Sequence, residues 1–287
     1  MNTLDTNNIS ISKLGGLNNS NYLISFSGSK FVLRIPSKDN NNNFYYENEI
    51  LNTIKFFNIS PEIIFHDKES GILLSRYIES QKFNTEFYNS TIFINKLVST
   101  LKKLHVLECS NSFNPFEEIY NNINLLLSLN YKFNHDINFL VNKLKELEKD
   151  LSKDVHYGLC HNDLNASNIL YSNDYTYFID FEFAGMGDIF FDLATISWFL
   201  EDKLKDELIK NYFGYFSVTL KKKLTGYLFV VKLWNATWSF IKSINNTSDY
   251  DYKLGGNMIL DDLIENYKKY WLIISILFLS FLIMQPS

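Results

Sequence analysis

The segment from His161 to Asp180 constrains the fold of this chain more than any other. It reads HNDLNASN over residues 161–168, continues as two apolar runs at 169–171 and 177–179, and ends at Asp180. The turn-prone stretch 172–175 separates the two runs, which predicts an antiparallel β-hairpin. If residue 174 is the midpoint of that turn, Asn168 and Asp180 face each other at the open end, with their Cα atoms about 5 Å apart.

This pairing predicts a site for one hard cation. An amide oxygen from Asn168 and a carboxylate oxygen from Asp180 suit Mg²⁺, which fills its other positions with water and substrate phosphates. Asp163, five residues before Asn168, would lie on the loop that enters the hairpin and accept a proton from an attacking hydroxyl. Asparagine is abundant in this chain, so the alternative is a loop in which these side chains only cap turns. The order Asp, Asn, hairpin, Asp favours a phosphoryl-transfer loop.

The remaining sequence divides into a β-rich part and a helical part. Residues 22–35 predict a hairpin around Ser27-Gly28-Ser29, residues 44–57 a helix, and residues 71–75 a strand. From residue 92 the apolar period becomes 3.6, which predicts helices over 92–104, 137–151, about 190, 201–213, 227–244 and from 258 onward. We therefore expect an α+β chain with a small N-terminal lobe, 1–78, a linker near 75–80, and a large helical C-terminal lobe, 79–287.

Composition and charge exclude several classes of protein. Lys and Arg total 27 against 32 Asp and Glu, a net charge of −5, so no overall basic surface for nucleic acid is expected. Cys109 and Cys160 supply neither a disulfide framework nor a cysteine-based metal site and are typical of a reducing compartment. Residues 1–12 lack the pattern of a signal peptide, which favours a cytoplasmic location.

The C-terminal residues 271–284, Trp271 to Met284, carry no charge. At about 1.5 Å per residue this stretch extends roughly 21 Å as a helix, short of the ~30 Å hydrocarbon core of a bilayer. A buried or interfacial helix is therefore favoured over a membrane anchor, and membrane contact is an alternative.

Two blocks, HNDLNASNIL at 161–170 and IDFEFAGMGDIFFDLA at 179–194, resemble the signatures of the choline/ethanolamine kinase family. The opening segments 14–22 and 31–36 resemble the nucleotide-covering turn and third strand of its bacterial members. The likeness extends over residues 11–255. The family that the chain resembles lies within the wider aminoglycoside-phosphotransferase and kinase-like superfamily. It implies a bilobal, protein-kinase-like fold and an enzyme that uses ATP and Mg²⁺. A protein kinase is disfavoured, because no DFG or APE pattern follows the loop.

The resemblance also implies roles for individual residues. Asp163 would be the general base and Asn168 and Asp180 the Mg²⁺ ligands, with Glu182 near a second metal or its waters. Arg34 would bind phosphate and pair with an acid on the next helix, Glu49 first and Glu47 second. Asp192 would support the catalytic loop. The remaining nucleotide contacts are expected at Gly15, Gly16, Asn18, Asn19 and Ser20 in the covering turn and at Arg76, Tyr77 and Ile78 in the linker.

The expected substrate is a small alcohol, with choline favoured. A quaternary ammonium needs aromatic faces because it donates no hydrogen bonds. The segment that resembles the choline pocket contains the candidates Trp234, Trp238, Tyr250 and Tyr252, and Glu201 or Asp202 would supply a negative charge. These aromatic residues are alternatively part of a core. Phe183 and Phe199 depart from residues common in the family, so ethanolamine, thiamine or an aminoglycoside remain alternatives, as does a catalytically silent choline- or nucleotide-binding protein. The sequence does not define the oligomeric state.

Overall fold

The computed structural model describes residues 9–16, 19–37, 44–81, 84–173, 175–244 and 250–266. The chain forms two compact units, one of residues 1–113 with 154–228 and the other of residues 114–153 with 229–287. Strands dominate the N-terminal part of the chain and helices the C-terminal part, which confirms the predicted α+β class. The lobe boundary at residue 78 stays a prediction, and the apolar stretch 271–284 lies outside the described residues.

A five-stranded antiparallel sheet in the order β1-β2-β3-β5-β4 forms the N-terminal part of the first unit. The predicted hairpin is confirmed, with Ser20 opposite Ile35 and Phe26 opposite Ser29. Ser27 and Gly28 both have positive φ, the conformation that lets a two-residue turn follow the twist of its strands. The strands are β1 (Ile9–Lys13), β2 (Ser20–Phe26), β3 (Ser29–Ile35), β4 (Ile63–His66) and β5 (Leu73–Arg76).

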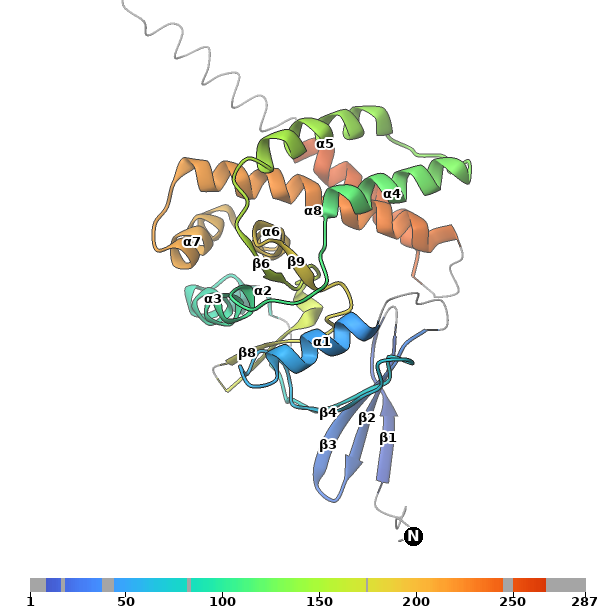
Figure 1. Cartoon of the computed structure of the whole chain (residues 1–287), viewed down its shortest axis with the longest axis vertical. Coiled ribbons are helices and arrows are strands. Elements are labelled where there is room, and N and C mark those ends of the chain that lie inside the picture. Colours follow the sequence, from blue (N-terminus) through green and yellow to red (C-terminus); the bar gives the residue numbers. More distant parts are fainter. Residues whose placement is uncertain are drawn as a thin grey trace, which may run out of the picture. The chain divides into compact units, whose positions relative to one another are not determined.

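Helix α1 (Phe44–Ile54) packs against this sheet (Figure 1). Its buried residues Glu47, Ile50, Leu51 and Ile54 recur at helical spacing and define one face. Glu47 is the exception on that apolar face: it forms an ion pair with Arg34 of β3 and lies 3.4 Å from the His66 ring of β4. The helix therefore directs one charged group into the sheet.

The rest of the first unit surrounds the loop at 161–165. Helix α3 is capped by Ser90, which accepts the N–H of Phe93, and buries Ile94, Leu97, Leu101 and Leu104 as their spacing predicts. The named elements are α2 (Thr85–Tyr88), α3 (Thr91–His105), β6 (Tyr157–Cys160), η2 (Ala166–Asn168), β7 (Ile169–Ser172), β8 (Tyr175–Phe178), β9 (Gly185–Asp188), α6 (Phe190–Ser197), α7 (Asp202–Phe213) and the beginning of α8 (Val218–Ile244).

The β7–β8 hairpin forms as predicted, but its register differs by one residue. Ser172 pairs with Tyr175, which leaves a two-residue turn in which Asn173 has φ 49°. The pairing centre therefore lies between residues 173 and 174 rather than at 174. As a result Asn168 lies opposite Ile179, whose N–H donates to the Asn168 carbonyl at 3.1 Å, and not opposite Asp180.

Helices make up the second unit. It contains α4 (Pro115–Ser128), α5 (Ile137–Leu151), the C-terminal part of α8, and a helix at 252–266. Asn114 and Asp136 cap α4 and α5 by accepting backbone N–H groups. Helix α8 and the last helix begin earlier than their apolar periods predicted. Within the ranges described above, no helix combines the length and the apolar character needed to cross a membrane.

Candidate active site

Hydrogen bonds to the backbone and to the His161 side chain fix the first residues of the loop that follows β6. Asp192, at the start of α6, accepts the backbone N–H of His161 at 2.8 Å and that of Asn162 at 2.7 Å. The His161 ring donates from Nε2 to the Ile179 carbonyl and accepts the N–H of Asp163 at Nδ1. Burial lowers the pKa of His161, which agrees with the neutral ring that this pattern requires. His161 thus positions the backbone of the loop.

Asp163 is oriented by two asparagine amides. Asn165 Nδ2 donates to one carboxylate oxygen at 3.0 Å, and Asn168 Nδ2 donates to the other at 2.8 Å. Asn168 also donates to the Asp163 carbonyl at 2.9 Å. These bonds use the amide nitrogen of Asn168 and leave its oxygen available as a cation ligand.

Asp180 lies just after β8 in a left-handed backbone conformation, φ 66°, which ends the strand and turns the side chain. Its Oδ1 accepts from Arg34 Nη1 at 2.9 Å. Burial, followed by the negative charge of Glu182, raises the pKa of Asp180 to about 7. Burial, followed by the charge of Asp180, likewise raises the pKa of Asp163 to about 8.

Asp163, Asp180 and Glu182 bring three carboxylates together as a donor set suited to a divalent cation. Asp163, Asp180 and Glu182 are close enough for mutual repulsion, and Asn168 adds a neutral oxygen. Oxygen ligands of this kind fit Mg²⁺, whose charge would stabilise the ionised carboxylates. The arrangement therefore fits the predicted metal, although the ligand roles stay predictions.

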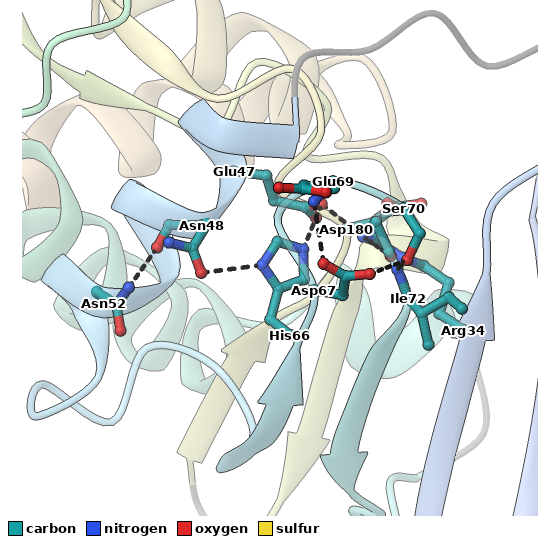
Figure 2. Close-up of polar contacts among 11 residues, drawn as sticks. Arg34, Glu47, Asn48, Asn52, His66, Asp67, Glu69, Ser70, Ile72 and Asp180 are labelled. Carbon is teal, nitrogen blue, oxygen red and sulfur yellow. Dashed lines mark hydrogen bonds and ion pairs between the residues drawn. The ribbon is translucent and has the colours of Figure 1, made fainter.

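Arg34 on β3 is buried and joins Asp180 to helix α1 (Figure 2). Its Nη2 donates to Glu47 Oε2 at 2.5 Å and lies 3.4 Å from the carbonyl of Gly71. Burial raises the pKa of Glu47, but His66 and Arg34 outweigh it, so the net shift is downward and Glu47 is ionised. One guanidinium therefore bridges an α1 acid and the predicted metal ligand.

The preference for Glu49 as the partner of Arg34 is wrong. Glu49 accepts the N–H of Ser110 at 2.8 Å and also its hydroxyl. Residue 47, not 49, shares the buried face with Ile50 and Ile54, and that helical spacing was present in the sequence. The periodicity would have identified the correct acid.

His66 is a polar residue of this cluster that the sequence did not reveal. It ends β4, and its side chain is buried. Nε2 lies 3.4 Å from Glu47 Oε2, and Nδ1 lies 3.2 Å from Asn48 Oδ1 (Figure 2). A single histidine at the end of a short strand carries no spacing signal.

The glycine-bearing turn connects β1 to β2. Asn21 Nδ2 donates to the Gly15 carbonyl, and a Cβ on Gly16 would lie 2.7 Å from that same nitrogen. Asn19 is buried, and its Oδ1 has no hydrogen-bond partner among the described residues. Ser20 begins β2, whereas Asn18 lies outside the described residues.

The predicted linker contacts follow β5. Arg76 ends this strand, and its side chain pairs with Glu62 at 2.7 Å on the surface. Tyr77 donates its N–H to the Lys30 carbonyl, and Ile78 is half-buried. Their contact with a nucleotide stays a prediction.

Three of the four aromatic candidates come together in the second unit. The rings of Trp238 and Tyr252 lie 5.8 Å apart and those of Tyr250 and Tyr252 4.9 Å apart. Lys242 Nζ lies 5.4 Å from the centre of the Trp238 ring. Trp234 is buried on α8. We call Trp238, Tyr250 and Tyr252 the aromatic cluster.

Glu201 belongs to the first unit. It is the N-cap residue of α7, is exposed, and pairs with Lys203 at 3.2 Å. Asp202 is the first residue of that helix and pairs with Lys205 at 2.9 Å.

His105, Cys160 and Asp192 form a buried group whose potential ligand atoms lie within 4.8 Å of one another. His105 Nε2 lies 3.1 Å from Asp192 Oδ2, and its Nδ1 lies 2.8 Å from the Tyr212 hydroxyl. Asp192 also accepts two loop N–H groups, and burial raises the pKa of the Cys160 thiol. The polar atoms are thus engaged in supporting the loop.

Comparison with known proteins identifies the family. Residues 11–227 match the phosphotransferase enzyme family. The chain is 30% identical over 218 residues to Protein LicA of Haemophilus influenzae, and the match covers 73% of this chain and 64% of that protein. A second Protein LicA, from Haemophilus influenzae strain Rd, is 30% identical over 205 residues, covering 68% of this chain and 76% of that protein.

Solved structures show the same fold. The choline kinase LicA from Streptococcus pneumoniae superposes with a TM-score of 0.76 at 22% identity, covering 90% of this chain and 95% of that one. A choline/ethanolamine kinase family protein from Mesorhizobium loti gives 0.75 at 22% identity, covering 89% and 87%. The GDP complex of aminoglycoside 2'-phosphotransferase-IIIa gives 0.71 at 14% identity, covering 92% and 95%. The predicted kinase-like fold is confirmed, and the chain belongs to the phosphotransferase enzyme family.

Proposed function

We propose that this protein transfers the γ-phosphoryl group of ATP to the hydroxyl of choline. The observation that carries the proposal is the convergence of Asp163, Asn168 and Asp180 within one compact unit, with Arg34 bound to Asp180. Phosphoryl transfer requires a proton acceptor, ligands for a metal ion, and a positively charged side chain that binds phosphate.

Asp163 is the proton acceptor in this proposal. Asn165 and Asn168 hold its two oxygens, so the carboxylate cannot rotate away from an incoming hydroxyl. A pKa of about 8 makes it a stronger base than an exposed aspartate once it is ionised. Nearby positive charge from bound Mg²⁺ favours that ionised form.

Asn168 and Asp180 would hold the metal, with Glu182 close to its waters. Held there, Mg²⁺ would supply positive charge to stabilise the phosphate oxygens. Arg34 presents a guanidinium whose fork geometry suits phosphate oxygens, and the turn from Gly15 to Ser20 would cover them.

The aromatic cluster supports choline as the acceptor. Aromatic faces attract a quaternary ammonium by about 0.5–2 kcal/mol each. Tyr250 is partly exposed although its ring lies against that of Tyr252, so burial in a core does not explain its position. The choline kinase LicA from Streptococcus pneumoniae, which shares this fold, supports the same substrate, and the Haemophilus relatives carry the same protein name.

An ADP-release assay with choline, ethanolamine, thiamine and an aminoglycoside tests this proposal. We expect turnover to be fastest with choline and to be lost in Asp163→Ala, while nucleotide binding persists. Faster turnover with another alcohol would reassign the substrate on the same fold. No ADP with any of the four would favour a silent binding protein.

A further inference from the structure

The inference concerns His66, which takes no part in the mechanism above. Its side chain is 3% exposed, and it meets the Arg34–Glu47 ion pair, whose side chains are 7% and 2% exposed. Figure 2 shows His66 between Glu47 on one side and Asn48 on the other. Both ring nitrogens therefore face named polar groups on α1.

The surroundings of Nε2 favour a hydrogen on this nitrogen. It lies 3.4 Å from Glu47 Oε2, a contact that falls outside hydrogen-bond geometry, and it has no hydrogen-bond partner among the described residues. A bare Nε2 would direct its lone pair at an ionised carboxylate in a buried site, which is repulsive. Asn48 accommodates the other nitrogen in either state, since its amide oxygen accepts from an Nδ1–H and its amide nitrogen, after a flip, donates to a bare Nδ1.

Glu47 depends on this contact for its orientation. His66 Nε2 and Arg34 Nη2 both approach Oε2, whereas Oε1 is buried and has no hydrogen-bond partner in the described part of the chain. Without His66, only Arg34 restrains the carboxylate, whose plane can then tilt about the bond that attaches it to the side chain. Arg34 would then lose a fixed partner on one side and keep only Asp180 on the other.

We propose that His66 is a positioning residue: it presents an Nε2 hydrogen to Glu47, restrains the plane of the carboxylate that Arg34 contacts, and so orients the guanidinium for nucleotide phosphates. The inference rests on the proposed function only in that Arg34 meets phosphate. It does not depend on which alcohol is phosphorylated.

Two substitutions of similar chemistry and different reach test the proposal. The amide nitrogen of a glutamine reaches about as far as His Nε2, whereas that of an asparagine reaches only as far as Nδ1. We expect His66→Asn and His66→Phe to weaken binding of a fluorescent ATP analogue with Mg²⁺ about three- to tenfold, and His66→Gln to stay within about twofold of wild type. His135→Asn, which removes a histidine paired with Asp261 in the second unit, is the matched control.

In steady-state assays His66→Asn and His66→Phe should raise the KM for ATP and leave the KM for the acceptor unchanged. In a Glu47→Gln background, His66→Phe should cause no further loss, since its effect acts through Glu47. Circular dichroism at the assay temperature confirms that each variant is folded.

Several results would overturn the proposal. Equal nucleotide affinity in wild type and His66→Phe would remove the positioning role, as would equal weakening by Gln and Asn. A ¹⁵N spectrum that shows no hydrogen on Nε2 of His66, identified by its absence in His66→Gln, would also overturn it. Failure of the wild type itself to bind nucleotide would instead reject the proposed function.

Discussion

At the scale of single residues, the site is a line of polar side chains in contact. His66 meets Glu47, Glu47 meets Arg34, and Arg34 meets Asp180. The acid pairs with Arg34 because it lies on the buried face of α1, two positions before the one that sequence similarity favoured. Glu47 and Glu49 thus offer a matched comparison on one helix.

Glu47→Gln should destabilise the protein by about 3 kcal/mol, because it removes the charge that compensates buried Arg34. Glu49→Gln removes a carboxylate that bonds Ser110 at the surface and should cost about 1 kcal/mol or less. Urea unfolding of both variants at pH 7 measures the difference. Equal losses would show that Arg34 does not depend on Glu47.

The raised pKa of Asp163 makes stability depend on pH. The folded carboxyl binds its proton up to about pH 8, against 3.8 for the ordinary value, so the folded state holds more protons between these limits. Stability therefore falls as pH rises from about 4 to about 8 in metal-free protein. Asp163→Asn removes the contribution of Asp163, while that of Asp180, whose pKa is raised to about 7, remains.

We expect the melting temperature of Asp163→Asn to exceed that of wild type by several degrees at pH 8, and the gap to close near pH 4. Calorimetry without divalent cations, across that range, gives the answer. A gap that is constant with pH would contradict the assigned shift.

At the scale of elements, the sequence predicted local structure better than register. The β2–β3 hairpin and the buried face of α3 followed from alternation and helical period. The β7–β8 hairpin was correctly located, but its register was not. The predicted turn is centred on residue 174, whereas the observed two-residue turn, with Asn173 at positive φ, is centred between residues 173 and 174. The short strands β6 and β9, with glycines at Gly158, Gly185 and Gly187, gave no alternation to read.

The turn between β4 and β5 contains Gly71, which lies against α1 and whose carbonyl is 3.4 Å from Arg34 Nη2. Gly71 has φ 69°, and a Cβ there would lie 2.5 Å from the Phe44 ring of α1. Gly71→Ala should cost about 2–3 kcal/mol, from backbone strain and from displacement of that ring.

Gly214→Ala is the control for this substitution. Gly214 has φ 81° at the end of α7, and no atom lies within 4 Å of an added Cβ, so only the backbone strain of about 1 kcal/mol applies. Denaturant midpoints compare the two variants. A cost at Gly71 no greater than that at Gly214 would show that the Phe44 contact is easily relieved.

At the scale of the whole molecule, chemistry and acceptor recognition are assigned to different compact units. The acid, amide and arginine proposed for phosphoryl transfer belong to the first unit, and the aromatic cluster belongs to the second. Most of the residues proposed for catalysis lie in one short segment, which is why the sequence alone points to them. Glu47 could have been identified from the helical period of α1, whereas His66 could not, because only the pairing of distant strands brings it to this group.

Trp238→Ala should therefore raise the KM for choline about tenfold and leave the KM for ATP unchanged. Steady-state kinetics with each substrate varied in turn separates the two effects. An equal rise in both constants would indicate general damage to the fold rather than loss of an ammonium-binding face.

The lysine above Trp238 gives the aromatic cluster a resident cation. The ring face is already shared with the ammonium of Lys242, which is attached one helical turn further along α8. If choline binds this ring face, its methylated ammonium would displace the Lys242 ammonium from the indole of Trp238. A neutral glutamine at position 242 should tighten choline binding, and added salt should reduce that advantage by screening the lysine it replaced.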